Sequence, residues 1–352
     1  KDFPYEDALQ MALAAGDGGS GVLQKLLAAM RHDHPVMRYW GATGCTIQGE
    51  TAAPAKSQLR ELLEDPSPSV RVAAAEALYV VGDKQAGFGG LIDILKEQLS
   101  MGITGFTHAT GSIEAYPEWE YIYSQHKGSL PRASIQVFWE GPEAMTAFGK
   151  KSGDGDEHLR VGPIKIFVDG GFTGPAAYTK EPYKGEADYR GKLSIDPGEL
   201  TTTIRELNAA GWQTGIHAIG DAAIELAVDE LAMALDETPR VDHRHYLNHF
   251  TVMPSAETMK KMAEYGIAIT QQPNFTYTLE GRYVEYLDGD RVAHNNPLRT
   301  PMNHGVHVAI SSDILPIGPM VGLYAAVTRK GLSGRVFAEE EALSMMEALQ
   351  AY

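Results

Sequence analysis

The feature that most constrains the fold is a regular alternation of short β-rich runs with helical runs after residue 88. Seven runs are rich in β-branched and aromatic residues, and helical runs that end near a glycine separate several of them. The β-rich runs cover residues 105–108, 134–139, 164–168, 214–217, 246–249, 267–271 and 306–311. Parallel neighbours need a long connection, so this alternation predicts parallel strands joined by helical crossovers.

The number of strands defines the expected fold class further. A segment of roughly 260 residues suits an α/β barrel of eight strand–helix units, and only seven strands can be identified. We therefore expect residues 89–352 to form an incomplete TIM-type (β/α) barrel of about seven strands. Helices are expected at residues 197–210, 221–235 and 256–265.

The first 88 residues have a different pattern, with helical spacing of apolar residues and a self-similarity at a period of 33. Pro35 matches Pro68 and Arg38 matches Arg71 at that period. Each copy predicts a helix that begins at a proline and ends near a glycine. We place the boundary between an all-α repeat (residues 1–88) and the α/β segment at the glycine-rich run 87–90.

This repeat resembles HEAT-like repeats, and its wording is similar to the helical tail of some bacterial sulfatases. Sulfatase chemistry is not expected, because the single cysteine, Cys45, lies in Gly-Cys-Thr-Ile and not in that family's nucleophile motif. We expect a packing or interaction module, and therefore a protein partner that binds through the repeat.

Composition excludes several classes of protein. Lys and Arg number 30 against 46 Asp and Glu, for a net charge of −16, which argues against nucleic acid or an anionic membrane surface as the main partner. One cysteine excludes a disulfide framework, and no run reaches the roughly 18 apolar residues that a membrane span needs. The chain begins Lys-Asp-Phe-Pro without a methionine, so we expect a processed protein or a fragment of unknown compartment.

Four side chains that can carry chemistry lie in or directly after the expected strands: Lys165, His217, His249 and Asp313. The carboxyl ends of barrel strands form the active face, so we expect the four to converge there. Nitrogen and oxygen donors that converge from rigid strands suit a divalent ion such as Zn²⁺, with one position open for water.

Each of the four also has an ordinary structural interpretation. Lys165 fits a solvated edge strand or an ion pair at the bottom of the barrel. His217 and His249 fit hydrogen-bonded histidines of a packed core. Asp313 fits a helix N-cap, although the prolines that follow it make an immediate helix less favourable.

The segment 91–352 resembles the amidohydrolase superfamily, and within it the amidohydrolase-3 group that includes formamide deformylases. The matching stretches run in family order across the segment: Met-Gly-Ile-Thr-Gly-Phe-Thr-His, Ile-Lys165-Ile-Phe-Val-Asp169-Gly, His217-Ala-Ile-Gly-Asp221, Leu-Asn-His249, Gly-Ile-Ala-Ile-Thr-Gln-Gln-Pro273 and Asn296-Pro-Leu-Arg followed by Ser-Ser-Asp313-Ile-Leu-Pro.

The resemblance implies a carboxylated Lys165 that bridges metal ions, with His217 and His249 as ligands. It implies that Asp313 both contacts metal and acts as the general base. The implied reaction is hydrolysis of non-peptide C–N bonds in a small-molecule amide, of the N-formyl or N-acyl type, by metal-activated water. The cofactor is expected to be one or two divalent ions, most simply Zn²⁺. The loop at residues 170–175 is expected at the mouth of the site.

The chain departs from the family pattern in three ways. In the family, a His-x-His pair ends the first strand of the barrel, and that is the strand that is not found here. The β-sandwich of the family is also missing. The sequence holds two other pairs, His32 with His34 and His243 with His245, neither of which is placed to serve. Asn248 stands where the group usually has Glu. The alternative function is therefore a catalytically incomplete fusion or fragment that acts as a non-enzymatic binding or structural protein.

Overall fold

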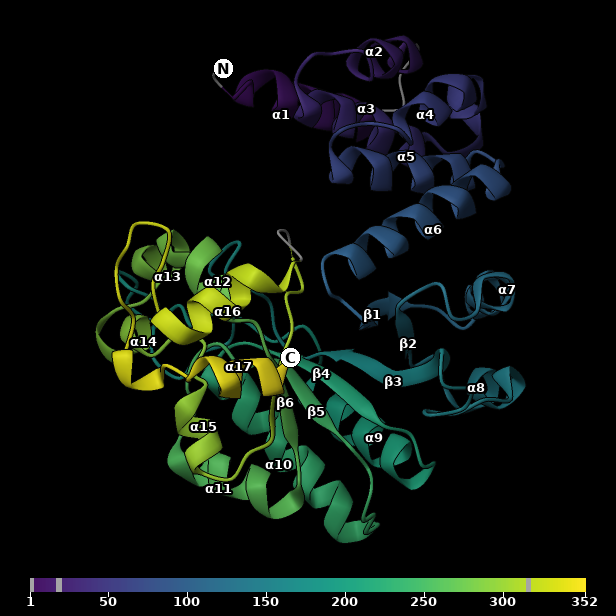
Figure 1. Cartoon of the computed structure of the whole chain (residues 1–352). Helices are drawn as coiled ribbons and strands as arrows, with labels where there is room; N and C mark the ends of the chain where they lie inside the picture. The colour runs from purple at the N-terminus through teal and green to yellow at the C-terminus, as the bar shows by residue number, and fades with distance from the viewer. Residues whose placement is uncertain (1–2, 17–20, 315–317) are drawn as a thin grey trace. The chain divides into compact units, whose positions relative to one another are not determined.

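The computed structural model describes residues 3–16, 21–314 and 318–352 (Figure 1). Its internal contacts divide it into two compact units. The helical unit comprises Lys1–Ser100 with Tyr121–Pro131, and the sheet unit comprises Met101–Glu120 with Arg132–Tyr352. Among the described residues, no helix combines the length and apolar character that crossing a membrane requires.

The helical unit is a stack of short helices around its own apolar core of alanine, leucine and valine side chains. Its helices are α1 (Tyr5–Gly16), α2 (Val22–Ala29), α3 (Pro35–Gln48), η1 (Gly49–Ala55), α4 (Lys56–Leu62), α5 (Pro68–Val80) and α6 (Lys84–Ser100). The all-α prediction for this part of the chain is confirmed.

The 33-residue period appears in the structure as two equivalent helix starts. Pro35 begins α3 and Pro68 begins α5, where a missing N–H costs nothing. The two matched arginines pair with acids about one helix further along the chain. Arg38 binds Asp65 at 2.6 Å, and Arg71 binds Glu97. Each of the two copies therefore contributes one arginine that forms an ion pair with a later segment of the helical unit.

The glycine-rich run at residues 87–90 lies inside α6, although we expected it to mark a domain boundary. A Cβ atom at Gly87 would lie 2.9 Å from the carbonyl oxygen of Ala75, and one at Gly90 would lie 2.8 Å from the Ala75 Cβ. The two glycines therefore let α6 approach α5 closely, and their sequence signal reports helix packing. The compact unit extends to Ser100.

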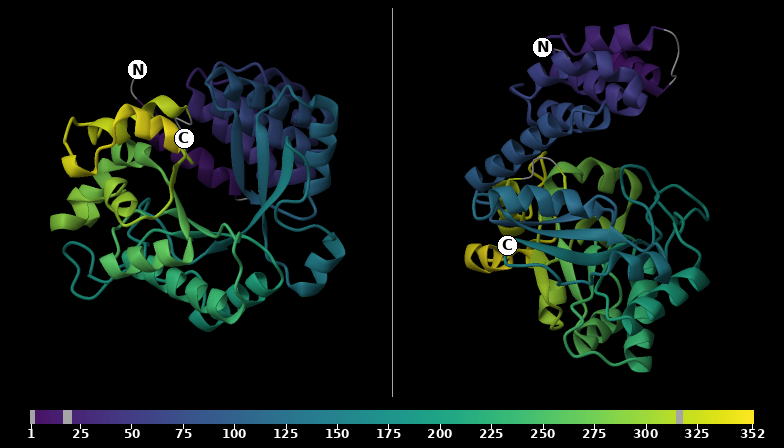
Figure 2. Two further views of the ribbon diagram at one scale, coloured as in Figure 1. Left: turned by 60° about the horizontal axis from the view of Figure 1, so that its bottom comes forward. Right: turned by 90° about the vertical axis from the view of Figure 1, so that its right-hand side faces the viewer.

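The sheet unit is built on seven parallel strands in the order of the sequence. The strands are β1 (Gly105–Gly111), β2 (Arg132–Phe138), β3 (Leu159–Phe167), β4 (Thr214–Ala218), β5 (Tyr246–His249), β6 (Ala268–Gln271) and β7 (Val308–Ile310). The sheet curls into part of a barrel (Figure 2, left). All seven predicted strands and the incomplete α/β barrel are confirmed.

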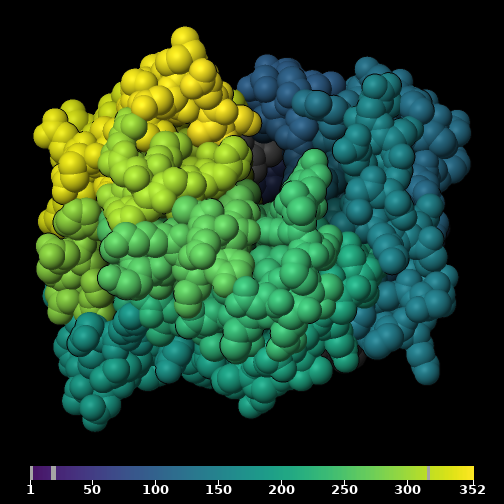
Figure 3. Space-filling model, turned by 90° about the horizontal axis from the view of Figure 1, so that it is seen from below, coloured from purple at the N-terminus to yellow at the C-terminus, as the bar shows by residue number. Residues whose placement is uncertain are grey.

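Helices cover the outer side of the sheet. The longer ones are α9 (Pro197–Ala209), α10 (Asp221–Glu237) and α11 (Ala256–Tyr265), as the spacing predicts. They form the surface seen from below in Figure 3, where the chain is green. The remaining elements are α7 (Tyr116–His126), α8 (Pro142–Phe148), α12 (Pro273–Thr278), α13 (Glu280–Tyr286), α14 (Gly289–Ala293), α15 (Arg299–Asn303), α16 (Pro319–Thr328), η2 (Glu339–Glu341) and α17 (Met345–Ala351).

A buried arginine ties the C-terminal segment to the loop before α15. Arg329 is fully buried and donates hydrogen bonds to the carbonyl oxygens of Asn295, Asn296 and Phe337, at 2.6 to 3.0 Å. Burial lowers the pKa of its guanidinium to about 10. The sequence pattern gives no indication of this role, because an arginine is ordinarily expected at the surface.

Candidate active site

The register of β3 and β4 places Lys165 and His217 on the same side of the sheet. Phe167 is paired with His217, and Lys165 stands two residues before Phe167. Side chains two residues apart in a strand point to the same face, and so do paired residues of parallel neighbours. The Lys165 ammonium lies 4.8 Å from the centre of the Phe167 ring, and that ring lies 5.2 Å from the His217 ring.

His249 reaches this group through a break in strand alternation. It is paired with Ala218, the residue after His217, so a regular strand would point it to the opposite face. His249 and Phe250 instead have positive φ values of 81° and 54°. This turn packs the two imidazoles together, with ring centres 4.4 Å apart and planes at 70°.

Asp313 follows β7 by three residues and also has a positive φ, of 59°. Although the residue is exposed, the protein packed around its carboxyl group raises its pKa, and the positive charges of Lys165 and His217 oppose the rise. Burial lowers the pKa of Lys165 to about 8, against the effect of the Asp313 charge. The structure thus places Lys165, His217 and His249 beside one another, and Asp313 close enough for its charge to act on Lys165 and His217. Positions 315 and 316 of the Asp313 motif lie outside the described residues.

Both imidazoles are neutral near pH 7. Burial is the main reason that the pKa of His217 falls to about 3, and the neighbouring His249 and Lys165 add to the effect. Burial likewise lowers the pKa of His249 to about 3. A neutral imidazole keeps a lone pair on one ring nitrogen, which is the form that binds a metal ion.

The hydrogen bonds of the two rings leave donor atoms free. His217 bonds to the backbone of Gly170, and its buried Nε2 has no hydrogen-bond partner within the described residues. His249 Nδ1 bonds to Gln272 Oε1 at 2.8 Å. A metal-binding histidine ordinarily has its second nitrogen held by such an acceptor. Gln272 was not predicted, although the Thr-Gln-Gln-Pro motif contains it.

Asp169 holds the loop beside His217 and is not a free carboxylate. It is buried and accepts hydrogen bonds from the backbone N–H groups of Tyr178, Ile219 and Gly220, at 2.8 to 3.0 Å. Burial still raises its pKa to about 7, in spite of these bonds. One oxygen lies 3.7 Å from His217 Nε2, beyond hydrogen-bond distance.

These residues fit a divalent ion in part. The unpartnered Nε2 of His217 and the oriented His249 ring are the nitrogen donors that zinc and similar ions prefer. In the part of the chain that the structure describes, however, no three His, Cys, Asp or Glu side chains are arranged to hold an ion. The two imidazoles are therefore the metal donors that the geometry supports directly.

The two His-x-His pairs have structural roles, in agreement with their predicted placement. His243 and His245 lie before the start of β5 and stack at 4.5 Å. Their ring nitrogens bond to the backbone at His245, Thr214 and Tyr265 and to the Asn208 side chain. In the other pair, His34 caps α3 by accepting from the Val36 N–H, and His32 accepts from the His34 N–H.

The loop expected at the mouth packs above the strand ends. Phe172 is buried at 3% exposure in an apolar cluster with Ile219 and Phe275, and it contacts Tyr183 and Tyr283 edge to face. Phe275 in turn stacks on His249 at 6.0 Å. The loop therefore adds an apolar cover on the side of His249.

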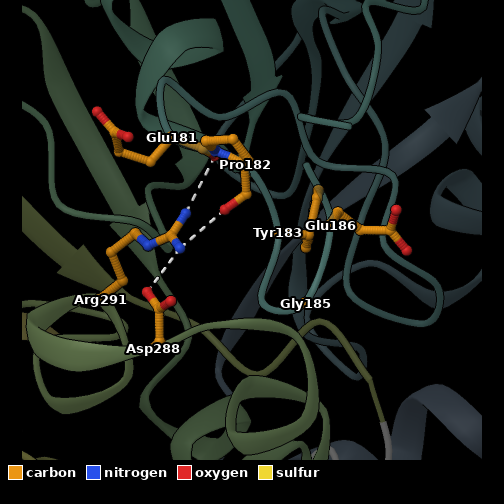
Figure 4. Close-up of a pocket in the computed structure, with 7 residues that line it drawn as sticks. All are labelled: Glu181, Pro182, Tyr183, Gly185, Glu186, Asp288 and Arg291. Atoms are coloured by element: carbon orange, nitrogen blue, oxygen red, sulfur yellow. Dashed lines mark hydrogen bonds and ion pairs between the residues drawn. The ribbon is translucent and has the colours of Figure 1, made fainter. Parts of the chain in front are cut away.

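A separate pocket of about 300 Å³ is lined by none of the four residues (Figure 4). Its lining residues are Glu181, Pro182, Tyr183, Gly185, Glu186, Asp288 and Arg291. Arg291 is already occupied, since it bonds to the carbonyl oxygens of Glu181 and Pro182 and to the Asp288 carboxylate. We regard it as a surface feature held in shape by Arg291.

Comparisons with known proteins concern the family and the fold of the chain. A family model described as "Amidohydrolase family" matches residues 48–352. The match begins in the helical unit, upstream of the segment in which we identified the resemblance. The putative amidohydrolase YtcJ of Bacillus subtilis is 30% identical over 232 residues, which cover 64% of this chain and 42% of that protein. Protein LONG AFTER FAR-RED 3 of Arabidopsis thaliana is 24% identical over 176 residues, which cover 49% of this chain and 30% of that protein.

Solved structures share the fold. An uncharacterized metal-dependent hydrolase from Pyrococcus horikoshii has a TM-score of 0.65 at 21% identity, covering 80% of this chain and 57% of that one. A corresponding hydrolase from Pyrococcus furiosus has a TM-score of 0.64 at 21% identity, covering 84% of this chain and 63% of that one. The chain thus spans less than half the length of the curated relatives and about three fifths of these structures.

Proposed function

The chain belongs to the amidohydrolase family, and we propose that it is a metal-dependent hydrolase of non-peptide C–N bonds in small-molecule amides of the N-formyl or N-acyl type. The observation that carries the proposal is the His217–His249 pair: two neutral imidazoles in contact, one with a buried unpartnered Nε2, beside Lys165 and Asp313. The family and the fold of the two Pyrococcus hydrolases support it.

His217 and His249 would hold a divalent ion, which we propose to be Zn²⁺, with Lys165 as the third ligand from this chain. When bound, such an ion lowers the pKa of water toward neutrality and polarises a carbonyl. Burial lowers the pKa of Lys165 to about 8, which makes its neutral amine accessible. That amine can add to carbon dioxide with loss of one proton, which gives a carbamate anion. Its negative charge would be paired with the divalent ion, since an unpaired buried charge of either sign is costly.

Asp313 would act as the general base and acid. Its carboxylate takes a proton from the attacking water and passes it to the leaving nitrogen, so that one water and one amide give a carboxylic acid and an amine. Burial raises the pKa of the Asp313 carboxyl, which makes its carboxylate a better proton acceptor. Asp313 follows β7, and its charge acts on Lys165 and His217.

The direct test is hydrolysis by the full chain, expressed with added zinc, of formanilide and of N-acetyl and N-formyl amines. We expect Asp313→Asn to lower kcat by about 10²- to 10⁴-fold, which is the usual contribution of a general base to the rate. Asp242→Asn is the matched control, because Asp242 is 71% exposed and pairs only with Arg244. Absence of hydrolysis and of bound metal would leave the non-enzymatic alternative.

The helical unit carries a separate proposal. We propose that it is a HEAT-like module, similar to the helical tail of some sulfatases, that binds a protein partner. The equivalent starts of α3 and α5 and the ion pairs of Arg38 and Arg71 support the repeat. A variant of the helical unit that no longer binds the partner should hydrolyse amides at the same rate as the unaltered protein. The two proposals can therefore be tested separately.

A further inference from the structure

Three residues form a row across β3, β4 and β5 on the same face of the sheet. Phe167 is paired with His217, and His217 is paired with Asn248. Paired residues of parallel strands point the same way, at a spacing of about 4.8 Å. His217 is therefore flanked by an aromatic ring on one side and a carboxamide on the other.

The carboxamide of Asn248 has a fixed orientation, and one of its two polar atoms has no hydrogen-bond partner among the described residues. Its Oδ1 accepts a hydrogen bond from the Thr270 hydroxyl at 3.0 Å, which fixes the plane of the amide. Its buried Nδ2 has no partner among the residues that the structure describes. A buried donor without an acceptor costs about 1–3 kcal/mol, so an oxygen atom offered to Nδ2 would be bound favourably.

The same network orients His249. Gln272 donates from Nε2 to the Thr270 carbonyl oxygen at 2.8 Å and to the Ser311 hydroxyl at 2.9 Å, while its Oε1 accepts from His249. The donor of Asn248 and the ring of His249 are thus fixed to the same segment of β6. A group bound by Asn248 is held at a defined position relative to the histidine pair.

The opposite side of His217 presents apolar surface. Phe167 is 39% exposed although it lies in a central strand. It stacks on Phe138 with ring centres 6.4 Å apart and planes at 26°, and its ring lies 5.2 Å from His217. Exposed aromatic surface beside a reactive centre is the usual contact for the apolar part of a ligand.

We propose that this row orients an aromatic amide. The aromatic substituent lies on Phe167 and Phe138, the scissile carbonyl lies over His217, and the carbonyl oxygen accepts a hydrogen bond from Asn248 Nδ2. The inference rests on the proposed hydrolase function and narrows its substrates to N-formyl or N-acyl derivatives of aromatic amines. The hydrogen bond strengthens as negative charge develops on the oxygen, so Asn248 acts mainly on the chemical step.

The aromatic part of the proposal is tested with a matched pair of substrates. Formanilide and N-cyclohexylformamide differ in the aromaticity of the ring and also in the basicity of the leaving amine, so the test is the change in their kcat/KM ratio between protein variants. Phe167→Leu keeps an apolar side chain, and we expect it to lower the preference for formanilide by about two- to tenfold relative to the unaltered protein, the value of one aromatic contact. An unchanged ratio in this variant overturns this part.

The hydrogen-bond part is tested at Asn248. Asn248→Ala and the isosteric Asn248→Asp should each lower kcat for both formamides by about 10²- to 10³-fold, as loss of an oxyanion donor does, and raise KM by about two- to tenfold, the value of the weaker hydrogen bond to the uncharged carbonyl. Thr270→Val leaves the donor in place without its orienting bond and should have a smaller effect in the same direction. Asn208→Ala is the control, because Asn208 bonds to the Ala234 and Thr238 carbonyl oxygens at the other end of the barrel.

Binding separates this inference from the proposed function. In the Asp313→Asn protein we would compare by calorimetry formanilide with N-methylaniline, which lacks the carbonyl oxygen. Tighter binding of formanilide that disappears on adding Asn248→Ala supports the row even if no amide is hydrolysed. Equal binding of the two compounds overturns it, whether or not hydrolysis is observed.

Discussion

Two pairs of histidines lie at opposite ends of the same strands, and they differ in how their ring nitrogens are used. His243 and His245 stack at 4.5 Å before β5, and His217 and His249 pack at 4.4 Å after β4 and β5. Burial lowers the pKa in both pairs, to about 3 at His245 and at His217. Burial and pKa therefore do not distinguish them.

Hydrogen bonding does distinguish the two pairs. The amino-end pair bonds to Thr214, Asn208 and Tyr265. At the carboxyl end, the buried Nε2 of His217 has no partner within the described part of the chain. A buried polar atom without a partner lowers stability and requires an explanation, and readiness to bind a ligand is the explanation that we favour. The two pairs have similar ring distances, so closeness of two histidines does not identify the candidate site. The ring nitrogen of His217 that has no hydrogen-bond partner in the described residues does.

The largest expected effect is the loss of activity in His217→Ala. We expect kcat/KM for formanilide to fall by about 10³-fold or more, because removal of a ligand removes the activation of water that metal catalysis provides. The free energy of unfolding of the metal-free protein, measured in urea, should change much less than it does for the amino-end pair. A variant that keeps full activity would break the comparison.

The amino-end pair should show the reverse behaviour. His245→Ala leaves the Thr214 N–H and the Asn208 carboxamide without their partner in a fully buried place, so we expect a loss of about 2–4 kcal/mol of stability. Per folded molecule, kcat/KM should stay within about twofold, as for surface changes away from a site. A large fall in kcat/KM at full folding would show that this pair takes part in function.

An intermediate effect is expected at Gln272, because it bonds to His249 at Nδ1 and would not itself contact the metal ion. Gln272→Leu keeps the size of the side chain and removes the acceptor, and we expect zinc affinity to fall by about 10- to 100-fold. Competition with a chromophoric chelator measures the change. An unchanged affinity would mean that His249 needs no orienting partner.

The last expected effect is a dependence of stability on pH. His245 stays neutral in the fold because burial lowers its pKa to about 3, below the unfolded value near 6.5. Its contribution is therefore complete above pH 6.5 and is lost as the pH falls toward 3. Comparison with His245→Asn should show the unaltered protein losing about 1.4 kcal/mol more per pH unit in this range. Parallel curves for the two proteins would contradict a buried neutral His245.

Much of the sheet unit could be predicted because strand alternation and crossover helices leave a periodic signal. That signal gave all seven strands and the location of Lys165 and His217 within two of them. It could not give the orientation of His249, which depends on a positive φ at a residue other than glycine. It also could not give Gln272 or the buried Arg329, because their roles depend on partners distant in the sequence.

In the helical unit, the helix starts could be predicted from the sequence, but the packing of the helices could not. Its period and helix starts could be predicted from Pro35 and Pro68, because proline at a helix start has a local cause. The glycines of α6 were misleading, since Gly87 and Gly90 serve a close contact with α5 that only the packed structure reveals. Local chemistry is readable from sequence, and contacts between distant segments are not.

The central claim is that the carboxyl-end histidine pair, and not the amino-end pair, holds a metal ion. The most direct measurement is the zinc content of full-length protein after equilibrium dialysis, for the unaltered chain, for His217→Ala with His249→Ala, and for His243→Ala with His245→Ala. We predict about one ion per chain, as one catalytic site requires, in the unaltered protein and in the second double variant, and none in the first. Zinc retained by the first double variant, or absent from the unaltered chain, would contradict the account.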